Sequence, residues 1–186
     1  MKSTATSPSI IVSAELALHE AQVADAEALY QLIDKHRLYM REWLPFVDHR
    51  VSVADTELYL RTVTAPDNLQ DQVYTIRYQG QVIGVIGYKT IDRVNNKLEI
   101  GYWLGENFQG KGIMTRSCDA LIHQAFEQMG MNRIQIKVGV GNNKSSRIPQ
   151  RLGFKLEGIE RDGEWLRGRF IDLEIYSLLK REWQKK

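Results

Sequence analysis

The order of hydrophobic and polar positions along the chain predicts one domain that mixes helices and strands. Apolar residues recurring every three or four positions, together with start signals, predict helices at 23–35, 52–63, 114–130 and 145–152. Alternating positions and apolar runs bounded by turns predict strands at 15–20, 73–78, 81–88, 98–104, 134–140, from 154 onward and at 170–178. This order of elements is typical of a mixed α/β or α+β fold.

Turn residues mark the boundaries between these elements. Gln79-Gly80 separates two β segments and predicts a tight hairpin, and Asp162-Gly163 predicts a second turn. Gly130 follows the clearest amphipathic segment and suits a helix C-cap. Trp43 and Phe46 flank a proline outside any periodic segment. We therefore expect a loop there, with its two aromatic side chains lining a groove on the acceptor side of a binding site.

The strand at 98–104 leads into the segment that is most typical of a ligand site. Its alternation places one set of side chains on one face, Leu98, Ile100, Tyr102 and Leu104, and another set on the opposite face, Glu99, Gly101 and Trp103. The glycine-rich stretch 105–112 then opens the helix at 114–130. Glycines let a ligand approach the backbone, and the unpaired N–H groups of a helix start attract anions. This predicts a phosphate site; the alternative is a tight turn that needs glycine only for its backbone angles.

The same loop allows two nucleotide-binding interpretations. Gly105, Gly110 and Lys111 match the start of a P-loop, which continues with a Ser or Thr that holds magnesium. Gly112 stands at that position, and no apolar strand ending in Asp follows to complete a metal site. Nucleotide hydrolysis is therefore disfavoured, and the residues downstream of Gln109 decide the other interpretation.

Six motifs follow in order over nearly the whole chain: Trp43-Leu-Pro-Phe46, Glu99-Ile-Gly-Tyr-Trp-Leu104, Phe108-Gln-Gly-Lys-Gly-Ile-Met114, Asn142-x-x-Ser145, Leu152-Gly-Phe154 and Asp172-Leu-x-x-Tyr-Ser-Leu-Leu179. Each alone is weak, but together they resemble the GNAT superfamily of N-acetyltransferases and, within it, the RimJ/RimL group of ribosomal-protein N-terminal acetyltransferases. The resemblance implies a GNAT fold: a mostly antiparallel central sheet with a splayed pair of parallel strands, flanked by helices.

The resemblance also implies where acetyl-coenzyme A, the co-substrate, would bind. Its pyrophosphate would lie on the backbone amides of Gln109, Gly110, Lys111, Gly112, Met114 and Thr115. Its pantetheine arm would pair, like an added strand, with Tyr102, Trp103 and Leu104 in the splay beside 134–140. Asn142 would hydrogen-bond the arm, and Ser145 would approach its sulfur. No metal is implied.

The chemistry of acetyl transfer indicates which side chains could act. The acceptor amine must lose a proton before it attacks, and the departing thiolate is stabilised by gaining one. Glu99 is the candidate base, directly or through water, and Ser145 the candidate partner of the sulfur. A backbone N–H near Trp103 could polarise the thioester carbonyl. Structural alternatives are that Glu99 anchors a turn and that Ser145 caps the helix after it.

Three positions depart from the family pattern. Met114 stands where a third glycine or an alanine is usual, and Pro149 stands where many members carry a tyrosine acid. His19 stands where the N-terminal strand of Rim-type enzymes usually has arginine. The loss of that tyrosine is why Ser145 has to be considered as the acid. Cys118 lies on the apolar stripe of its helix, which suits a core residue rather than a nucleophile.

Composition narrows the partners and the compartment. The 186 residues carry a formal net charge of +2, which argues against general nucleic-acid binding. A single cysteine excludes an intrachain disulfide, and no stretch is apolar enough for a membrane span or signal peptide. We expect a cytoplasmic protein with a flexible leader at 1–12 and one acetyltransferase domain at 13–186. A homo-oligomer stays open.

These observations predict an enzyme that transfers an acetyl group to a primary amine, foremost the N-terminal amine of a ribosomal protein. Two alternatives remain: acetylation of a small amine such as a polyamine or an aminoglycoside, and a non-catalytic coenzyme A sensor or RNA-associated module.

Overall fold

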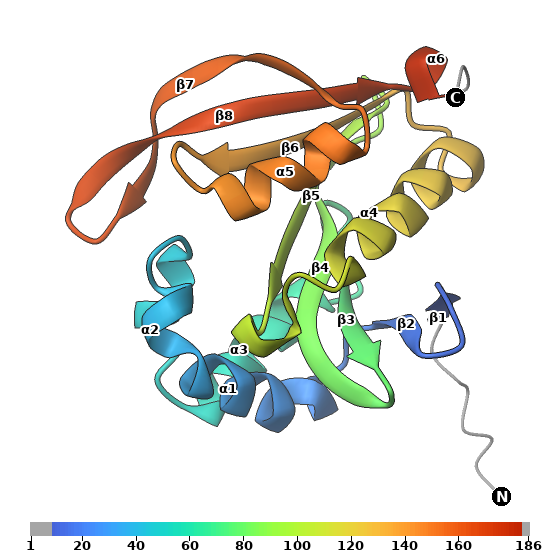
Figure 1. Ribbon diagram of the computed structural model, residues 1–186. Coiled ribbons are helices and arrows are strands. Elements are labelled where there is room, and N and C mark those ends of the chain that lie inside the picture. Colours follow the sequence, from blue (N-terminus) through green and yellow to red (C-terminus); the bar gives the residue numbers. More distant parts are fainter. Residues whose placement is uncertain (1–8, 184–186) are drawn as a thin grey trace, which may run out of the picture.

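The computed structural model describes residues 9–183 and builds them around one sheet (Figure 1). Its eight strands lie in the order β1-β2-β3-β4-β5-β6-β8-β7. Their bounds are β1 Ser9–Ile11, β2 Leu16–Glu20, β3 Gln72–Tyr78, β4 Gln81–Asp92, β5 Lys97–Leu104, β6 Arg133–Gly139, β7 Lys155–Leu166 and β8 Arg169–Leu179. Neighbours pair antiparallel except β5 and β6, which run parallel. The predicted mixed α/β fold is confirmed.

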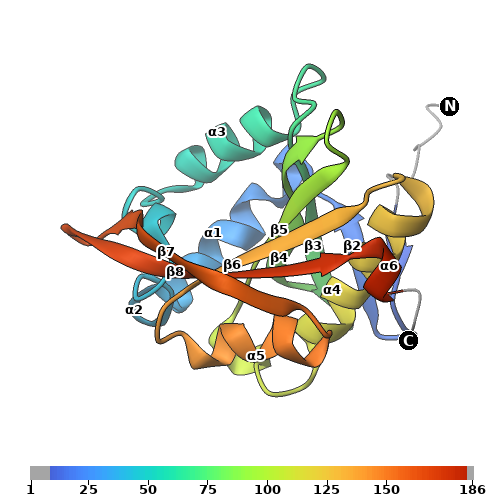
Figure 2. The same cartoon turned by 90° about the horizontal axis from the view of Figure 1, so that it is seen from above.

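Helices cover both faces of this sheet. The longer ones are α1 Ala26–Lys35, α3 Val53–Val63, α4 Ile113–His123 and α5 Asn143–Arg151; the shorter ones are α2 Arg37–Met40 and α6 Lys180–Trp183. Seen from above, α3 and α5 lie on opposite sides of the sheet (Figure 2). One apolar cluster joins α4 to the strands, and a second joins α1 and α3 to Val85 and Trp103. The sheet therefore has a separate core on each face.

The alternation predicted for residues 98–104 is confirmed in β5. Leu98 and Ile100 are buried against α4, with Tyr102 and Leu104 packed beside them. Trp103 belongs to the cluster on the opposite face. Because side chains alternate along a strand, Glu99 shares that second face with Trp103. Strand β5 thus presents different chemistry to each side of the sheet.

Strands β5 and β6 separate soon after they begin. Their pairing covers Lys97 with Arg133, Leu98 with Ile134 and Glu99 with Gln135. Both strands then continue, β6 as far as Gly139, while β6 pairs with β8 along its whole length. The splay predicted from the family resemblance is therefore present. It leaves the second half of β5 with a free edge toward β6.

The turn predicted at Asp162-Gly163 is wrong. Both residues lie inside β7, and the hairpin turns at Arg167 and Gly168 instead. The register of β7 against β8 shifts between Glu160 and Glu164. Asp162 has a φ of 53°, so the Asp-Gly pair forms a bulge within the strand rather than its end.

Other boundaries also differ from the sequence prediction. Strand β1 falls within the predicted leader at 1–12 and pairs with β2, so residues 9–11 are part of the sheet; residues 1–8 lie outside the described residues. The helix predicted at 114–130 is α4 followed by a π-helical turn at Gln124–Gln128. The helix predicted at 52–63 is confirmed, with the Ser52 side chain accepting a hydrogen bond from the Asp55 N–H.

An ion pair ties β7 to β6 and supplies a first test of the fold. Glu157 accepts hydrogen bonds from Arg133 at 2.6 and 2.7 Å and from Ser177, and these bonds lower its pKa to about 2. A lowered pKa stabilises the fold above the ordinary value of 4.5, and the gain is lost as pH falls toward 2. Because the side chain is 43% exposed, we expect Glu157→Gln to cost only about 1 kcal/mol at pH 7.

Urea unfolding of wild type and E157Q at several pH values tests this prediction. The difference between wild type and E157Q should shrink between pH 5 and pH 2, whereas Glu57→Gln, in an exposed pair with Arg61, should have little effect at any pH. A difference that does not change with pH would contradict the assignment.

Candidate active site

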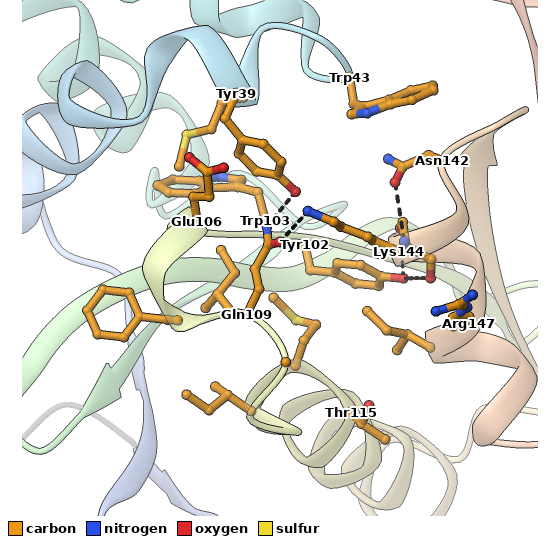
Figure 3. Close-up of a pocket in the computed structure, with 18 of the residues that line it drawn as sticks. Tyr39, Trp43, Tyr102, Trp103, Glu106, Gln109, Thr115, Asn142, Lys144 and Arg147 are labelled. Carbon is orange, nitrogen blue, oxygen red and sulfur yellow. Dashed lines mark hydrogen bonds between the residues drawn. The ribbon is translucent and has the colours of Figure 1, made fainter.

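A cavity of 570 Å³ opens where β5, α4 and α5 meet α2 (Figure 3). Nearly all the residues predicted to bind the cofactor line it: Tyr102, Trp103, Leu104, Gln109, Gly110, Gly112, Met114, Thr115, Asn142 and Ser145. Lys111 does not; its ammonium lies 5.6 Å from the centroid of the Phe108 ring. Loop, helix starts and strand edge thus converge on one space.

The start of α4 is built to receive an anion. Gly110 and Gly112 have φ values of 74° and 69°, and Gly112 is the N-cap. The first helical bond runs from the Arg116 N–H to the Gly112 carbonyl at 3.1 Å, so the preceding amides of the first turn have no partner within the helix. These amides and the helix dipole favour a phosphate. Met114, at the departure from the family pattern, is buried and packs against the core.

Basic and amide side chains line the same cavity as this helix start. Lys144, Arg147 and Arg151, all from α5, line the cavity. Gln109 joins the loop to two neighbouring elements: it donates to the Tyr39 hydroxyl, and its Oε1 accepts from Lys144 at 3.3 Å (Figure 3). Sequence reasoning missed Tyr39, because α2 carries no motif that relates it to a loop 70 residues away.

The start of α5 brings the candidate acid into place. Asn142, not Ser145, is the N-cap: its Oδ1 accepts from the Ser145 N–H at 3.2 Å. The alternative that Ser145 caps this helix is therefore wrong. The Ser145 Oγ instead donates to the Tyr102 hydroxyl at 3.2 Å, and that hydroxyl donates to the Ser145 carbonyl at the same distance. Burial raises the pKa of Tyr102, so its phenol stays protonated.

The free edge of β5 offers backbone groups to the splay. Gly105 donates its N–H to Ile83 of β4 at 2.9 Å. Because the main-chain groups of an antiparallel pair alternate in direction, those of Trp103 face β4 as well. The groups that face the splay belong to Tyr102 and Leu104. An extended amide-bearing arm could satisfy them as a neighbouring strand would.

A second cavity of 440 Å³ lies on the other face of β5. It shares Trp43, Tyr102 and Asn142 with the first, so the two spaces meet at the splay. Trp43 lies against Gly139, whose lack of a side chain leaves room for the indole. Phe46 lines only the second cavity and packs on Trp103, with ring centroids 6.1 Å apart. Both aromatic residues therefore wall this space, and their assignment to the acceptor side stays a prediction.

Two carboxylates line the second cavity. Glu99 has a side chain that is 16% exposed and lies 3.8 Å from the ammonium of Lys89 on β4. Glu164 reaches the cavity from β7, beside the bulge. Burial, and then the charge of Glu99, raise the pKa of Glu164, while Lys89 and Lys137 lower it. Glu99 thus faces a lysine rather than a turn, and Glu164 adds a second carboxyl group to the same cavity.

Sequence reasoning missed Glu164. The Asp162-Gly163 pair predicted a turn, and a residue just after a turn gives no sign that it returns to the site. Only the bulge in β7 and the fold of the hairpin over β5 bring this side chain to the cavity.

Three other residues considered in the sequence analysis, Cys118, Pro149 and His19, do not line either cavity. Cys118 is fully buried, and burial raises the pKa of its thiol, which makes it a core residue. Pro149 is buried within α5 and offers no hydroxyl. His19 lies in β2, paired with Thr75. Among residues 9–183, no three His, Cys, Asp or Glu side chains gather where they could hold a metal, and no helix is long and apolar enough to span a membrane.

A comparison with protein families decides what this architecture is. The family described as acetyltransferase (GNAT) domain matches residues 15–155. The chain belongs to the GNAT family of acetyltransferases. The prediction of an enzyme with a GNAT fold is thereby confirmed, and a GNAT acetyltransferase takes its acetyl group from acetyl-coenzyme A. The cavity of 570 Å³, with its helix start, basic side chains and free strand edge, has the features that this molecule requires.

Individual GNAT proteins resemble the chain over almost its full length. The putative ribosomal N-acetyltransferase YdaF of Bacillus subtilis (strain 168) is 40% identical over 179 residues, which cover 93% of this chain and 96% of YdaF. The structure of the ribosomal L7/L12 alpha-N-protein acetyltransferase RimL, in complex with coenzyme A, has a TM-score of 0.88 at 30% identity. The match covers 92% of this chain and 98% of RimL. The structure of the microcin C7 self immunity acetyltransferase MccE, in complex with acetyl-CoA and AMP, has a TM-score of 0.87 at 32% identity. The match covers 95% of this chain and 97% of the MccE chain. The prediction of a RimJ/RimL-like GNAT protein is confirmed.

Proposed function

We propose that this GNAT enzyme acetylates the N-terminal amine of a protein, foremost a ribosomal protein. The observation that carries the proposal is the meeting of two cavities at the β5–β6 splay, one suited to the cofactor and one holding two carboxylates. The ribosomal acceptor is supported by the likeness to YdaF and RimL. Such an acceptor would place the reaction in the cytoplasm.

Cofactor binding would use the first cavity. The amides after Gly112, with Lys144 and Arg147, would hold the pyrophosphate. The main-chain groups of Tyr102 and Leu104 would pair with the pantetheine arm. Asn142 has its Oδ1 engaged by Ser145, which leaves its amide hydrogens free to donate to a carbonyl. Acetyl-coenzyme A supplies an acetyl group activated as a thioester.

Proton transfer would use both cavities. An ammonium acceptor would enter the second cavity and lose its proton to a carboxylate, directly or through water. Glu164 suits this task best, because its raised pKa makes it a stronger base than an exposed glutamate. On the cofactor side, the linked hydroxyls of Ser145 and Tyr102 would donate to the departing sulfur. This pair would replace the tyrosine that Pro149 displaces.

The charges of the second cavity disfavour a polycationic acceptor. Glu99 and Glu164 are accompanied there by Arg50, Lys89 and Lys137. A polyamine or an aminoglycoside calls for an excess of carboxylates, and this wall has none. The similarity to MccE nevertheless keeps a small amine as an arm of the test.

Acceptor labelling tests the proposal. The protein is incubated with radiolabelled acetyl-coenzyme A and ribosomal proteins, and separately with a panel of polyamines and aminoglycosides. We expect labelled ribosomal protein whose N-terminal residue carries the acetyl group by mass spectrometry. Label confined to lysine side chains or to the small amines would contradict the proposed acceptor. No label in either set would contradict both the N-terminal acceptor and the small-amine acceptor.

Replacing Ser145 by Ala tests the role of the hydroxyl pair. Because Asn142 caps α5, the variant should fold and keep its affinity for acetyl-coenzyme A. We expect kcat to fall about tenfold through the loss of one hydrogen bond to the developing thiolate. Ser146→Ala is the matched control, since the Ser146 hydroxyl bonds within the helix to the Asn143 carbonyl. Unchanged kcat in S145A would leave Tyr102 as the donor.

A further inference from the structure

Arg50 is a buried cation in the wall of the acceptor cavity. Only 9% of the residue is exposed, and it lines the second cavity together with Glu99 and Glu164. A charged side chain this deeply buried normally has an ionic partner. Among the ion pairs of residues 9–183, none includes Arg50. The cost of burying this charge is therefore not offset by a carboxylate of the described residues.

Two aromatic rings hold the guanidinium in place. Its Cζ lies 4.2 Å from the centroid of the Phe46 ring and 3.7 Å from that of Tyr59. Contacts of this kind compensate part of the lost hydration. The guanidinium also hydrogen-bonds to Tyr59, which engages only part of its five N–H donors. The aromatic contacts thus orient Arg50 without neutralising it.

The protonation states of Arg50 and Tyr59 also indicate that the guanidinium has no counterion among residues 9–183. Burial lowers the pKa of Arg50 and the neighbouring Tyr59 opposes that effect, yet an arginine stays charged at neutral pH. Burial also raises the pKa of Tyr59, so its phenol is neutral and cannot act as a counterion. Each of the two lysines in the same wall lies near a carboxylate, Lys89 near Glu99 and Lys137 near Glu160. Arg50 is the cation of this wall that lacks one.

We propose that Arg50 binds a carboxylate of the acceptor: the side chain of an acidic residue close to the N-terminus of the acetylated protein. The inference rests on the proposed function and adds a sequence preference to it. One acceptor would then satisfy both sets of charges, with its amine toward Glu99 and Glu164 and its carboxylate on Arg50. A guanidinium fixed by aromatic rings suits a bidentate bond to a planar carboxylate.

Matched peptides test the preference. Pairs of peptides share an N-terminal Ser and carry Glu or Gln at the second, third or fourth position. Both kcat/KM and binding to the protein saturated with coenzyme A, by calorimetry, are measured for each pair. We expect wild type to prefer Glu over Gln about tenfold at one position, mainly through KM, as one charge-assisted bond would give.

Variants of Arg50 assign the preference to this side chain. In Arg50→Gln the ratio of kcat/KM for the Glu peptide to kcat/KM for the Gln peptide should fall to about one. In Arg50→Lys this ratio should be intermediate, because lysine keeps the charge and loses the planar geometry. Arg61→Gln, at an exposed arginine of α3 paired with Glu57, should retain the wild-type ratio. Urea unfolding of each variant checks that the ratios compare folded proteins.

Each outcome decides the inference. No preference in wild type, or a preference that survives in R50Q, would overturn it. A peptide with phosphoserine at the same position that binds tightly, while the Glu peptide does not, would overturn the carboxylate in favour of a phosphate. If no peptide is acetylated but the Glu peptide still binds preferentially through Arg50, the proposed function fails and the anion site stands.

Discussion

Replacing Glu164 by Gln is expected to lower kcat/KM for the acceptor about 100-fold while leaving the affinity for acetyl-coenzyme A unchanged. Glu164 lines the second cavity and not the first, and its raised pKa suits a group that takes a proton from an ammonium. Losing a general base typically costs at least that factor. Gln keeps the size of the side chain, so the fold should not change.

Glu160→Gln is the control for this variant. Glu160 lies on the same strand but pairs with Lys137 at 2.7 Å and does not line either cavity. Its loss should change kcat/KM little. If E160Q were as impaired as E164Q, the effect would come from the β7–β8 hairpin rather than from the carboxyl group.

The pH dependence separates Glu164 from Glu99. A base acts only when deprotonated, so activity should rise with pH through the raised pKa of Glu164, and this acidic limb should vanish in E164Q. In Glu99→Gln we expect the limb to move to lower pH, because removing a neighbouring negative charge lowers the pKa of Glu164. If E99Q instead abolishes the limb and E164Q leaves it in place, Glu99 is the base, as the sequence alone suggested.

The cofactor side of the site could be predicted from local sequence. The strand 98–104, the glycine-rich loop and the start of α4 are contiguous, so alternation and turn residues predict a strand that leads into an anion site at a helix start. The family resemblance then names the residues that would hold the cofactor. Asn142 and Ser145 follow the next strand and come with a motif. Even here the sequence leaves the cap of α5 open, because Asn142 and Ser145 are both good N-cap residues and periodicity does not fix the first turn.

The acceptor side depends on contacts between distant segments. Glu164 reaches the cavity only because β7 continues through a bulge, and Asp-Gly is equally compatible with a turn. Arg50 is buried because Phe46 and Tyr59, from two separate elements, close over it. In the first cavity, too, the contact between Tyr39 and Gln109 joins two distant segments. None of these pairings has a local signal, and each follows from the way the elements pack on the sheet.

The second large effect is expected from Gly112→Val, which should weaken coenzyme A binding about 100-fold. Gly112 has a φ of 69°, a conformation that a β-branched residue adopts only with strain. The loop would relax toward negative φ and turn the amides at the start of α4 away from the pyrophosphate. Losing two charge-assisted hydrogen bonds, each worth about 1.5 kcal/mol, accounts for the factor.

Gly130→Val is a closely matched control, because Gly130 has the same φ of 69° and, like Gly112, no heavy atom within 4 Å of an added Cβ. Both substitutions should therefore lose a similar free energy of unfolding, of about 1–3 kcal/mol, in urea. Only Gly112 lines the cofactor cavity, so calorimetry with coenzyme A should show a weakened Kd in G112V and a wild-type Kd in G130V. An equal loss of affinity in the two variants would attribute the effect to general destabilisation, and no loss in either would mean that the pyrophosphate does not depend on this loop.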